Sequence, residues 1–246
     1  MVHSDPAALT RPHPRERRRQ ETAGRIVEAA GEIVARGGFE ALTMHHLARV
    51  LGYTVGALYR YFPSKEALVV AVLARVLDAL RADWQAAGER CEAWLVRSRG
   101  TEPEDAALLR LLVALAGYEA FAERRPQPFR LLSAWLGDPR EIGASSAGAL
   151  LTPSLLATTR HLRGLLEEAA AAGALAGGDA RRRALVLWGG LHGSMQMRRF
   201  GRLGIPDFSA APLSPDLAEC LLAAWGARAD RVAPLQRLAR KLARAG

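Results

Sequence analysis

Polar and small side chains gather between residues 43 and 65 in a pattern suited to contacts with a nucleic acid. Hydroxyl, imidazole and cationic groups donate hydrogen bonds to phosphates or base edges, and small residues let a helix approach a groove closely. The candidates for such contacts are Thr43, His45, Thr54, Val55, Gly56, Ala57, Tyr59, Arg60, Tyr61 and Lys65. The pattern therefore favours noncovalent recognition of duplex DNA.

Each candidate also has a structural explanation that involves no DNA. Thr43 and Thr54 are equally well explained as helix caps, because a threonine hydroxyl accepts a free backbone N–H. Tyr59 and Tyr61 are explained by packing, and Arg60 by a solvated surface position. The argument for DNA binding depends on their occurrence together at this spacing, since a helix-turn-helix pattern by itself is common.

Two short helices and a tight turn position these side chains. Thr43 precedes a predicted helix over Met44–Val50, Gly52 supplies the turn, and Thr54 precedes a second helix over Val55–Tyr61. This spacing is typical of a helix-turn-helix, predicted over residues 43–62, in which the second helix enters the major groove.

A helix is expected on each side of this unit. Glu21–Arg36 carries an apolar stripe and ends at Gly37-Gly38, as a C-terminal glycine predicts. After Pro63, a further helix runs from about Lys65 to about Arg81 and leads into the rest of the chain. We therefore expect residues 20–80 to form the DNA-binding domain and residues 81–246 a larger helical domain.

Residues 1–19 are rich in proline and arginine, which predicts a disordered basic arm. Arg15, Arg17, Arg18 and Arg19 either enter a minor groove or belong to a solvated tail. Net charge is +9 with a sequence isoelectric point near 10.6. Residues 1–75 hold 11 Lys and Arg against 7 Asp and Glu, so the charge favours a polyanionic partner only mildly.

Composition predicts an all-α protein, because Ala, Leu and Arg dominate and strand-like alternation is absent from the sequence. Cys91 and Cys220 lie far apart, which favours neither a metal site nor a disulfide framework. The most apolar stretch, 106–122, contains Arg110 and Glu119, so a membrane span is not expected and a cytoplasmic protein is. Further helices are predicted over Asp105–Arg125, Gln127–Leu136, Ser154–Ala172, Asp179–Phe200, Pro215–Ala227 and Pro234–Arg244, with Ser154 and Ser214 as N-caps and loops over Gly137–Gly148 and Gly201–Leu213.

Residues 20–80 resemble the N-terminal domain of the TetR family of bacterial transcriptional regulators. The motifs that carry the resemblance are Gly37-Gly38-Phe39, Leu42-Thr43-Met44, Leu51-Gly52-Tyr53, Gly56-Ala57-Leu58-Tyr59-Arg60-Tyr61-Phe62 and Lys65-Glu66-Ala67-Leu68. The resemblance implies a homodimer that reads a palindromic double-stranded operator. It also implies that residues 81–246 are an effector-binding and dimerisation domain, which binds a small-molecule effector. The family often has His where this chain has Tyr61 and Lys where it has Val55, so Val55 is expected to touch a thymine methyl group.

The C-terminal half resembles the Trp-His-Gly subgroup of this family through Trp188-Gly189-Gly190-Leu191-His192-Gly193. Candidate effector contacts are Tyr118, Trp135, Trp188, His192 and Met195. An alternative interpretation makes His192 a core histidine, and a second hypothesis makes the chain a small-molecule-binding protein or enzyme with a vestigial helix-turn-helix. We expect a transcriptional repressor, without catalytic residues, cofactor or bound metal.

Overall fold

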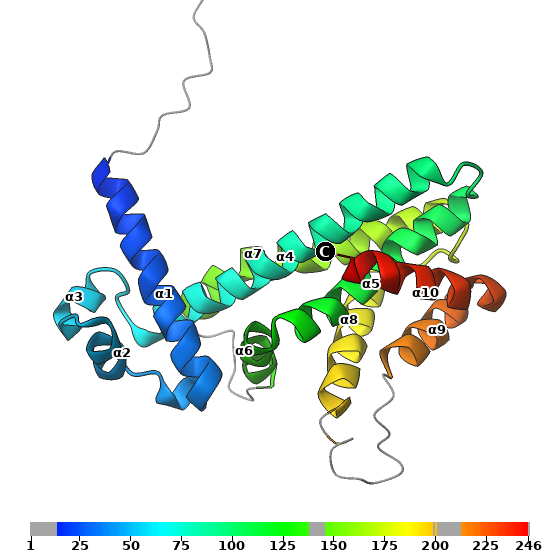
Figure 1. Ribbon diagram of the computed structural model, residues 1–246. Coiled ribbons are helices and arrows are strands. Elements are labelled where there is room, and N and C mark those ends of the chain that lie inside the picture. The colour runs from blue at the N-terminus through cyan, green and yellow to red at the C-terminus, as the bar shows by residue number, and fades with distance from the viewer. Residues whose placement is uncertain (1–13, 138–145, 199, 201–212, 246) are drawn as a thin grey trace, which may run out of the picture. The chain divides into compact units, whose positions relative to one another are not determined.

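The computed structural model describes residues 14–137, 146–198, 200 and 213–245, and within these ranges the regular elements are helices (Figure 1). The chain divides into two compact units, one ending at Val72 and the other beginning at Leu73. The division falls inside a helix, nearer the start of that helix than the boundary after residue 80 that the sequence predicts. The all-α prediction is confirmed for the described residues.

The first unit contains α1 (Pro14–Ala41), α2 (Met44–Leu51), α3 (Val55–Tyr59) and the start of α4 (Lys65–Arg97). Its core is apolar and fully buried at Ile26, Ala30, Leu42, Leu47, Leu58 and Leu68. Five of these residues come from the four helices and Leu42 from the link between α1 and α2, so their burial fixes α2 and α3 against α1 and α4. The predicted stripe on the first helix is thereby confirmed, with Ala29 half-buried.

The first helix differs from the prediction at its start, whereas the predicted end at Gly37-Gly38 coincides with a break in the helix. It begins at Pro14, so Arg15, Arg17, Arg18 and Arg19 are helical and not part of a disordered arm; residues 1–13 lie outside the described residues. Proline suits the first helical turn because its missing N–H has no partner there in any case. Gly38 interrupts the helix with φ of 74°, and a last turn then follows to Ala41.

The second unit is built around α5 (Pro103–Arg124), which is buried along most of its length. Nearly every side chain from Ala107 to Phe121 is buried, and a helix that is apolar on all sides needs neighbours on all sides. Helices α6 (Pro126–Leu136), α7 (Ser146–Ala171) and α10 (Ala229–Arg244) pack against it, and α8 (Ala180–Met197) and α9 (Ser214–Ala224) complete the unit (Figure 1).

Close helix approaches in this unit depend on glycine. A side chain at Gly190 would meet Leu217 at 2.9 Å, so the missing Cβ lets α9 lie against α8. A side chain at Gly117 would meet the Trp84 ring at 3.0 Å, which places the indole directly on α5.

Several predicted boundaries are wrong in this unit. Helix α7 begins at Ser146, so Ser154 lies inside it and is not an N-cap. Ser214 is itself the first residue of α9, and Leu213 occupies the cap position without a side-chain cap bond. Helix α10 begins at Ala229 and accommodates Pro234 in its interior.

The remaining boundaries agree more closely. The helices predicted from Asp105 and Gln127 begin one or two residues earlier, and Asp179 caps α8 by accepting the Arg182 N–H at 3.1 Å. The loop predicted over Gly201–Leu213 lies outside the described residues except for Leu213. None of the helices is both long enough and apolar enough to cross a membrane within the described part of the chain.

Gly52 is the residue whose backbone geometry the turn between α2 and α3 requires. Its φ is 68°, and its N–H closes the end of α2 on the carbonyls of Ala48 and Arg49. A Cβ there meets no atom within 4 Å, so Gly52→Ala isolates the backbone strain. We expect a loss of about 1–2 kcal/mol in unfolding free energy, measured by chemical denaturation.

Gly56→Ala is the matched control, because its Cβ also meets nothing within 4 Å and its position is helical. That variant is expected to be neutral or to gain up to about 1 kcal/mol. Equal stabilities of the two variants would contradict the role assigned to Gly52.

Candidate functional site

Three hydroxyl caps fix the helix starts around the candidate DNA-binding surface. The side-chain oxygens of Thr43, Thr54 and Ser64 accept the backbone N–H groups of His46, Ala57 and Ala67 at 3.1, 3.2 and 3.1 Å. Each cap satisfies a donor that the first helical turn leaves unpaired. The predicted capping roles of Thr43 and Thr54 are confirmed, and their contacts with DNA stay predictions.

Helix α3 turns one face into the core and the other toward solvent. Leu58 is fully buried, whereas the next residue, Tyr59, is 48 % exposed. Gly56 adds no side chain to the outer face, and nothing stands within 4 Å of its missing Cβ. The outer face is therefore free to approach another molecule closely.

The ten predicted DNA contacts all lie in the first unit. Six of them are exposed, namely Thr43, His45, Thr54, Gly56, Tyr59 and Arg60, and four are half-buried, namely Val55, Ala57, Tyr61 and Lys65. Helix α3 ends at Tyr59, so Arg60 and Tyr61 belong to the turn that follows it and not to the predicted helix.

A basic groove adjoins this surface. Arg15, Arg18, Arg19 and Thr22 of α1 line it on one side, and Arg60 and Tyr61 line the other, around a volume of about 520 Å³. We name it the arginine groove. The sequence analysis missed it because the α1 arginines were assigned to a disordered arm; their three- and four-residue spacing, once placed on a helix, predicts a shared face.

A cluster of aromatic and imidazole rings occupies the interior of the second unit. The Tyr118 hydroxyl lies 2.7 Å from Nδ1 of His192, and both residues are buried. Phe129 contacts both rings, edge-on to Tyr118 with centroids 5.9 Å apart and tilted against His192 with centroids 5.2 Å apart. Trp84 extends the cluster, with centroids 6.3 Å from Tyr118 and 5.2 Å from His161.

Burial keeps the two hydrogen-bonded groups of this cluster uncharged. It lowers the pKa of His192 to about 4. It also raises the pKa of Tyr118 well above its ordinary range, with the Trp188 indole working against that rise. Both side chains are therefore neutral at physiological pH.

Two buried nitrogen atoms of the ring cluster lack a hydrogen-bond partner among the described residues. They are Nε1 of Trp84 and Nε2 of His192, in side chains that are 4 % and 6 % exposed. Buried polar atoms are normally paired, because leaving one unpaired costs about 1–3 kcal/mol.

Four of the five predicted effector contacts, Tyr118, Trp188, His192 and Met195, are buried in this unit. Trp135 is half-buried on α6, and the ring contacts found among the described residues do not include it. The cluster also contains His161, which the sequence analysis missed. Its pairing with Trp84 joins α4 to α7, and no local sequence signal reports such a tertiary contact.

A cavity of about 250 Å³ opens between α4, α5 and α7. Its lining combines the Trp84 indole with apolar Val113 and Leu165, and His161 stands at its exposed rim. The lining does not include the five predicted effector contacts. Trp84 connects the cavity to the ring cluster, which contains two of those five contacts, Tyr118 and His192.

Charged and nucleophilic groups at this cavity are held in stable forms. Arg110 donates two hydrogen bonds of 2.6 and 2.8 Å to the Glu92 carboxylate. Burial raises the pKa of the Cys91 thiol to about 11, so the thiol stays protonated at neutral pH. This chemistry suits binding better than nucleophilic attack.

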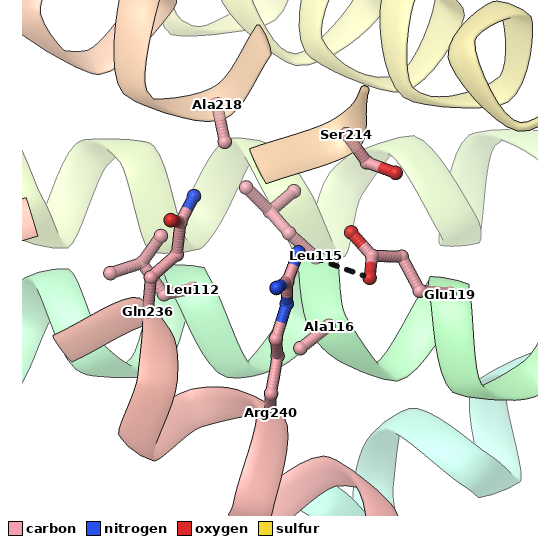
Figure 2. A pocket seen from close by; sticks show the side chains of 8 residues that line it. All are labelled: Leu112, Leu115, Ala116, Glu119, Ser214, Ala218, Gln236 and Arg240. Atoms are coloured by element: carbon pink, nitrogen blue, oxygen red, sulfur yellow. Dashed lines mark ion pairs between the residues drawn. The ribbon is translucent and has the colours of Figure 1, made fainter. Parts of the chain in front are cut away.

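A second, smaller cavity separates α5 from α9 and α10. Figure 2 shows Glu119 of α5 facing Arg240 of α10, with Ser214 above and Gln236 beside them. The carboxylate and guanidinium are 3.8 Å apart, and burial raises the pKa of Glu119 while Arg240 and Ser214 oppose that rise. Its volume, about 10 Å³, holds no more than one water molecule, so this site holds helices together and admits no effector.

Ion pairs continue along the contact between α10 and α5. Arg231 lies 2.5 Å from Asp105, and Arg244 lies 3.0 Å from Glu123. Within the described residues, no group of three or more His, Cys, Asp and Glu side chains is arranged to hold a metal ion.

Comparisons with known proteins agree with this division into two units. Residues 26–72 match the family described as "Bacterial regulatory proteins, tetR family". Residues 111–224 match the family described as "Tetracyclin repressor-like, C-terminal domain". The HTH-type transcriptional repressor KstR of Rhodococcus jostii is 41 % identical over 61 residues, which cover 25 % of this chain and 29 % of that protein. KstR of Mycobacterium tuberculosis is 43 % identical over 68 residues, covering 28 % and 29 %. The chain thus aligns with less than a third of the length of these relatives.

Solved structures share the fold over most of the chain. FadR of Bacillus subtilis, solved in complex with stearoyl-CoA, has a TM-score of 0.56 at 18 % identity and covers 81 % of this chain and 97 % of its own. A tetR-family regulatory protein from Rhodococcus RHA1 has a TM-score of 0.57 at 20 % identity, covering 85 % and 98 %. The Trp-His-Gly subgroup stays a prediction. With both of its units matched, the chain belongs to the TetR family of bacterial regulatory proteins.

Proposed function

We propose that this protein is a transcriptional repressor that binds a palindromic operator as a homodimer and releases it when a small-molecule effector binds the second unit. The observation that carries the proposal is the capped α3, whose Leu58 is buried and whose opposite face is exposed. Family membership supports the same function. A regulator of this kind acts on chromosomal DNA, so we place it in the cytoplasm.

The exposed face divides into groups suited to bases and groups suited to phosphates. Gly56 and Ala57 allow close approach to the floor of the major groove, and Val55 suits a thymine methyl group. The hydroxyls of Tyr59 and Tyr61 donate to phosphates, which set the register of a protein on the duplex. Arg60 is long enough for a phosphate or a guanine edge.

Lys65 and Arg60 test this assignment. Lys65→Ala should weaken binding to all duplexes and reduce the slope of log K against log salt by about one unit, because one phosphate contact is lost. Arg60→Ala should cost roughly 1–3 kcal/mol on the operator if Arg60 reads a guanine. Fluorescence anisotropy across a salt series measures both.

Arg36→Ala is the control, since Arg36 is an exposed cation of the same unit that pairs with Glu32 on α1 at 3.2 Å. It should keep the wild-type slope. A Lys65→Ala slope equal to that of Arg36→Ala would remove Lys65 from the interface, and a loss at Arg60→Ala that is uniform across sequences would make it a phosphate contact.

The dimer is proposed to form through α8 and α9, which pack against each other within the unit. Helix α8 exposes Leu185 and Val186 at 51 % and 48 %. One and two turns further, Gly189 and Gly193 have nothing within 4 Å of a Cβ position. Large apolar side chains beside open glycines suit a close helix-to-helix contact. Two such pairs related by a twofold axis form a four-helix bundle.

Val186→Glu should convert the dimer to a monomer, because a carboxylate would be buried without a partner at the interface. Analytical ultracentrifugation gives the mass. Leu156→Glu is the matched control, since Leu156 is also 48 % exposed but lies on α7. A Val186→Glu protein that sediments like Leu156→Glu would rule out this interface.

The effector is proposed to bind at the cavity between α4, α5 and α7 and to engage the ring cluster behind Trp84. A protonated Tyr118 has a hydrogen to give, and Nδ1 of a neutral His192 accepts it, which leaves the hydrogen of His192 on Nε2. Trp84 Nε1 and His192 Nε2 are then both unpaired donors.

Neutral donors favour an apolar molecule that carries an uncharged oxygen acceptor such as a ketone, ester or thioester carbonyl. The fold relative FadR was solved with stearoyl-CoA, whose thioester carbonyl is an acceptor of this kind. For this chain the ligand class rests on its own donors. The two interpretations of His192, as a core histidine and as an effector contact, are compatible, because a hydrogen-bonded core histidine also serves as a ligand contact.

The lowered pKa of His192 makes stability depend on pH. The unfolded chain takes up this proton near 6.5 and the folded chain near 4, so the unfolded state binds more protons between these values. Stability is therefore complete above 6.5 and is lost as pH falls toward 4, by about 3 kcal/mol in total.

His192→Gln should remove this part of the pH dependence, measured as unfolding free energy at a series of pH values. His45→Gln, which removes an exposed imidazole from α2, is the control and should follow the wild-type curve. A His192→Gln curve parallel to wild type would show that His192 titrates normally.

A further inference from the structure

A basic pocket lies in the second unit, where α5 ends and α6 begins. Its volume is about 260 Å³, and it is lined by Asp83, Ala86, Arg90, Arg124 and Arg125. We name it the junction pocket. Three guanidinium groups against one carboxylate leave the lining with an excess of two positive charges. The pocket shares no lining residue with the cavity proposed for the effector.

The turn between α5 and α6 brings two neighbouring arginines to the same side. Side chains that follow each other on an unbroken helix point about 100° apart. Pro126 disfavours a helical conformation at the residue before it, and Arg125 accordingly has φ of −124° and ψ of 63°. Helix α5 therefore ends at Arg124, and the side chains of Arg124 and Arg125 both reach Asp83 of α4.

The Asp83 carboxylate shows that this turn binds an oxyanion, and that it binds Asp83 loosely. Arg125 donates to the carboxylate at 3.2 and 3.3 Å, and Arg124 donates at 3.4 Å. Such charge-assisted bonds are ordinarily about 2.7–2.9 Å long. The pair of Arg110 and Glu92 in the same unit reaches 2.6 and 2.8 Å. The two guanidinium groups at the junction thus share one carboxylate at long range.

Arg90 supplies a third guanidinium group that α10 holds in place. Its Nε and Nη2 donate to the backbone carbonyls of Leu242 and Ala243, in the last turn of α10, at 2.7 and 3.3 Å. No carboxylate pairs with Arg90 among the described residues. The end of a helix offers only about half a negative charge, so part of the charge of Arg90 is left unbalanced.

We propose that the junction pocket binds a small phosphate-bearing anion. A phosphate monoester carries roughly −1.5 to −2 charges at neutral pH, which matches the excess charge of the lining. Each guanidinium group has five N–H donors in a planar fork that fits two phosphate oxygens at once, and Asp83 uses few of them. The site is additional to the proposed effector and operator sites, because its residues belong to neither.

The test titrates the full-length, DNA-free protein with inorganic pyrophosphate by isothermal calorimetry at low ionic strength. Saturable binding of one pyrophosphate per chain is expected. Arg124→Ala with Arg125→Ala should weaken it by at least about tenfold, because two charge-assisted contacts are lost. Arg97→Ala with Arg99→Ala is the matched control, since it removes two exposed cations of the same unit that do not line the pocket. The control should bind as tightly as wild type.

Asp83→Asn separates a ligand site from a purely structural ion pair. The amide keeps the shape of the side chain and removes the negative charge that competes with phosphate, so pyrophosphate should bind about tenfold more tightly. This gain also decides the question if the alanine double variant does not fold. The proposal is overturned if wild type and Asp83→Asn both lack saturable binding, or if the control loses as much affinity as the alanine double variant.

Two further probes identify the source of the phosphate. Binding of inorganic phosphate as tight as that of pyrophosphate would support a free ion, whereas tighter binding of ADP would support the phosphate part of a larger molecule. DNA is the remaining possibility. Absence of pyrophosphate binding, with a reduced salt slope on the operator for Arg124→Ala with Arg125→Ala, would assign these arginines to DNA and overturn the proposal while leaving the proposed function intact.

Discussion

The burial of Leu58 is the interaction on which the DNA-binding surface depends. Helix α3 has five residues, far fewer than an isolated helix needs to persist in water. Its shape is therefore imposed from outside, by the fully buried Leu58 on one side and by the Thr54 cap at its start. With Leu58 fixed in the core, helical geometry directs the side chains of Tyr59 and Arg60 toward solvent.

The second unit buries polar rings, those of Tyr118 and His192, inside an apolar core. Helix α5 supplies Tyr118 to the ring cluster and Glu119 to the ion pair with Arg240, from two adjacent positions that face different neighbouring helices. The ion pair holds α10 against α5, whereas the ring cluster leaves the N–H groups of Trp84 and His192 without partners among the described residues. One side of α5 is thus committed to stability, while the other keeps hydrogen-bonding capacity for a ligand.

Local sequence signals predicted the first unit well and the second less well. Thr43, Gly52 and Thr54 each act within four residues, so their caps and turn were readable from the sequence. The start of α1 at Pro14 was missed because the composition of residues 1–19 predicted a disordered arm. The interior Pro234 of α10 was missed because proline was taken as the start of that helix.

The candidate sites follow the same division. The ten residues of the helix-turn-helix were named from a contiguous motif, and the structure gathers them in one unit. Trp84, Phe129 and His161 come together from α4, α6 and α7, and the arginine groove joins α1 to the turn after α3. Such meetings depend on tertiary packing, which the spacing of residues along one helix does not encode.

The most direct test of the account is capture of sheared genomic DNA from the source organism on the purified protein, followed by sequencing. The account predicts enrichment of a few palindromic sites whose half-sites lie one helical turn, about 34–36 Å, or a multiple of it apart. Enrichment should disappear with Tyr59→Ala combined with Lys65→Ala. A folded, dimeric protein that enriches no site, with or without added cell extract metabolites, would contradict sequence-specific regulation.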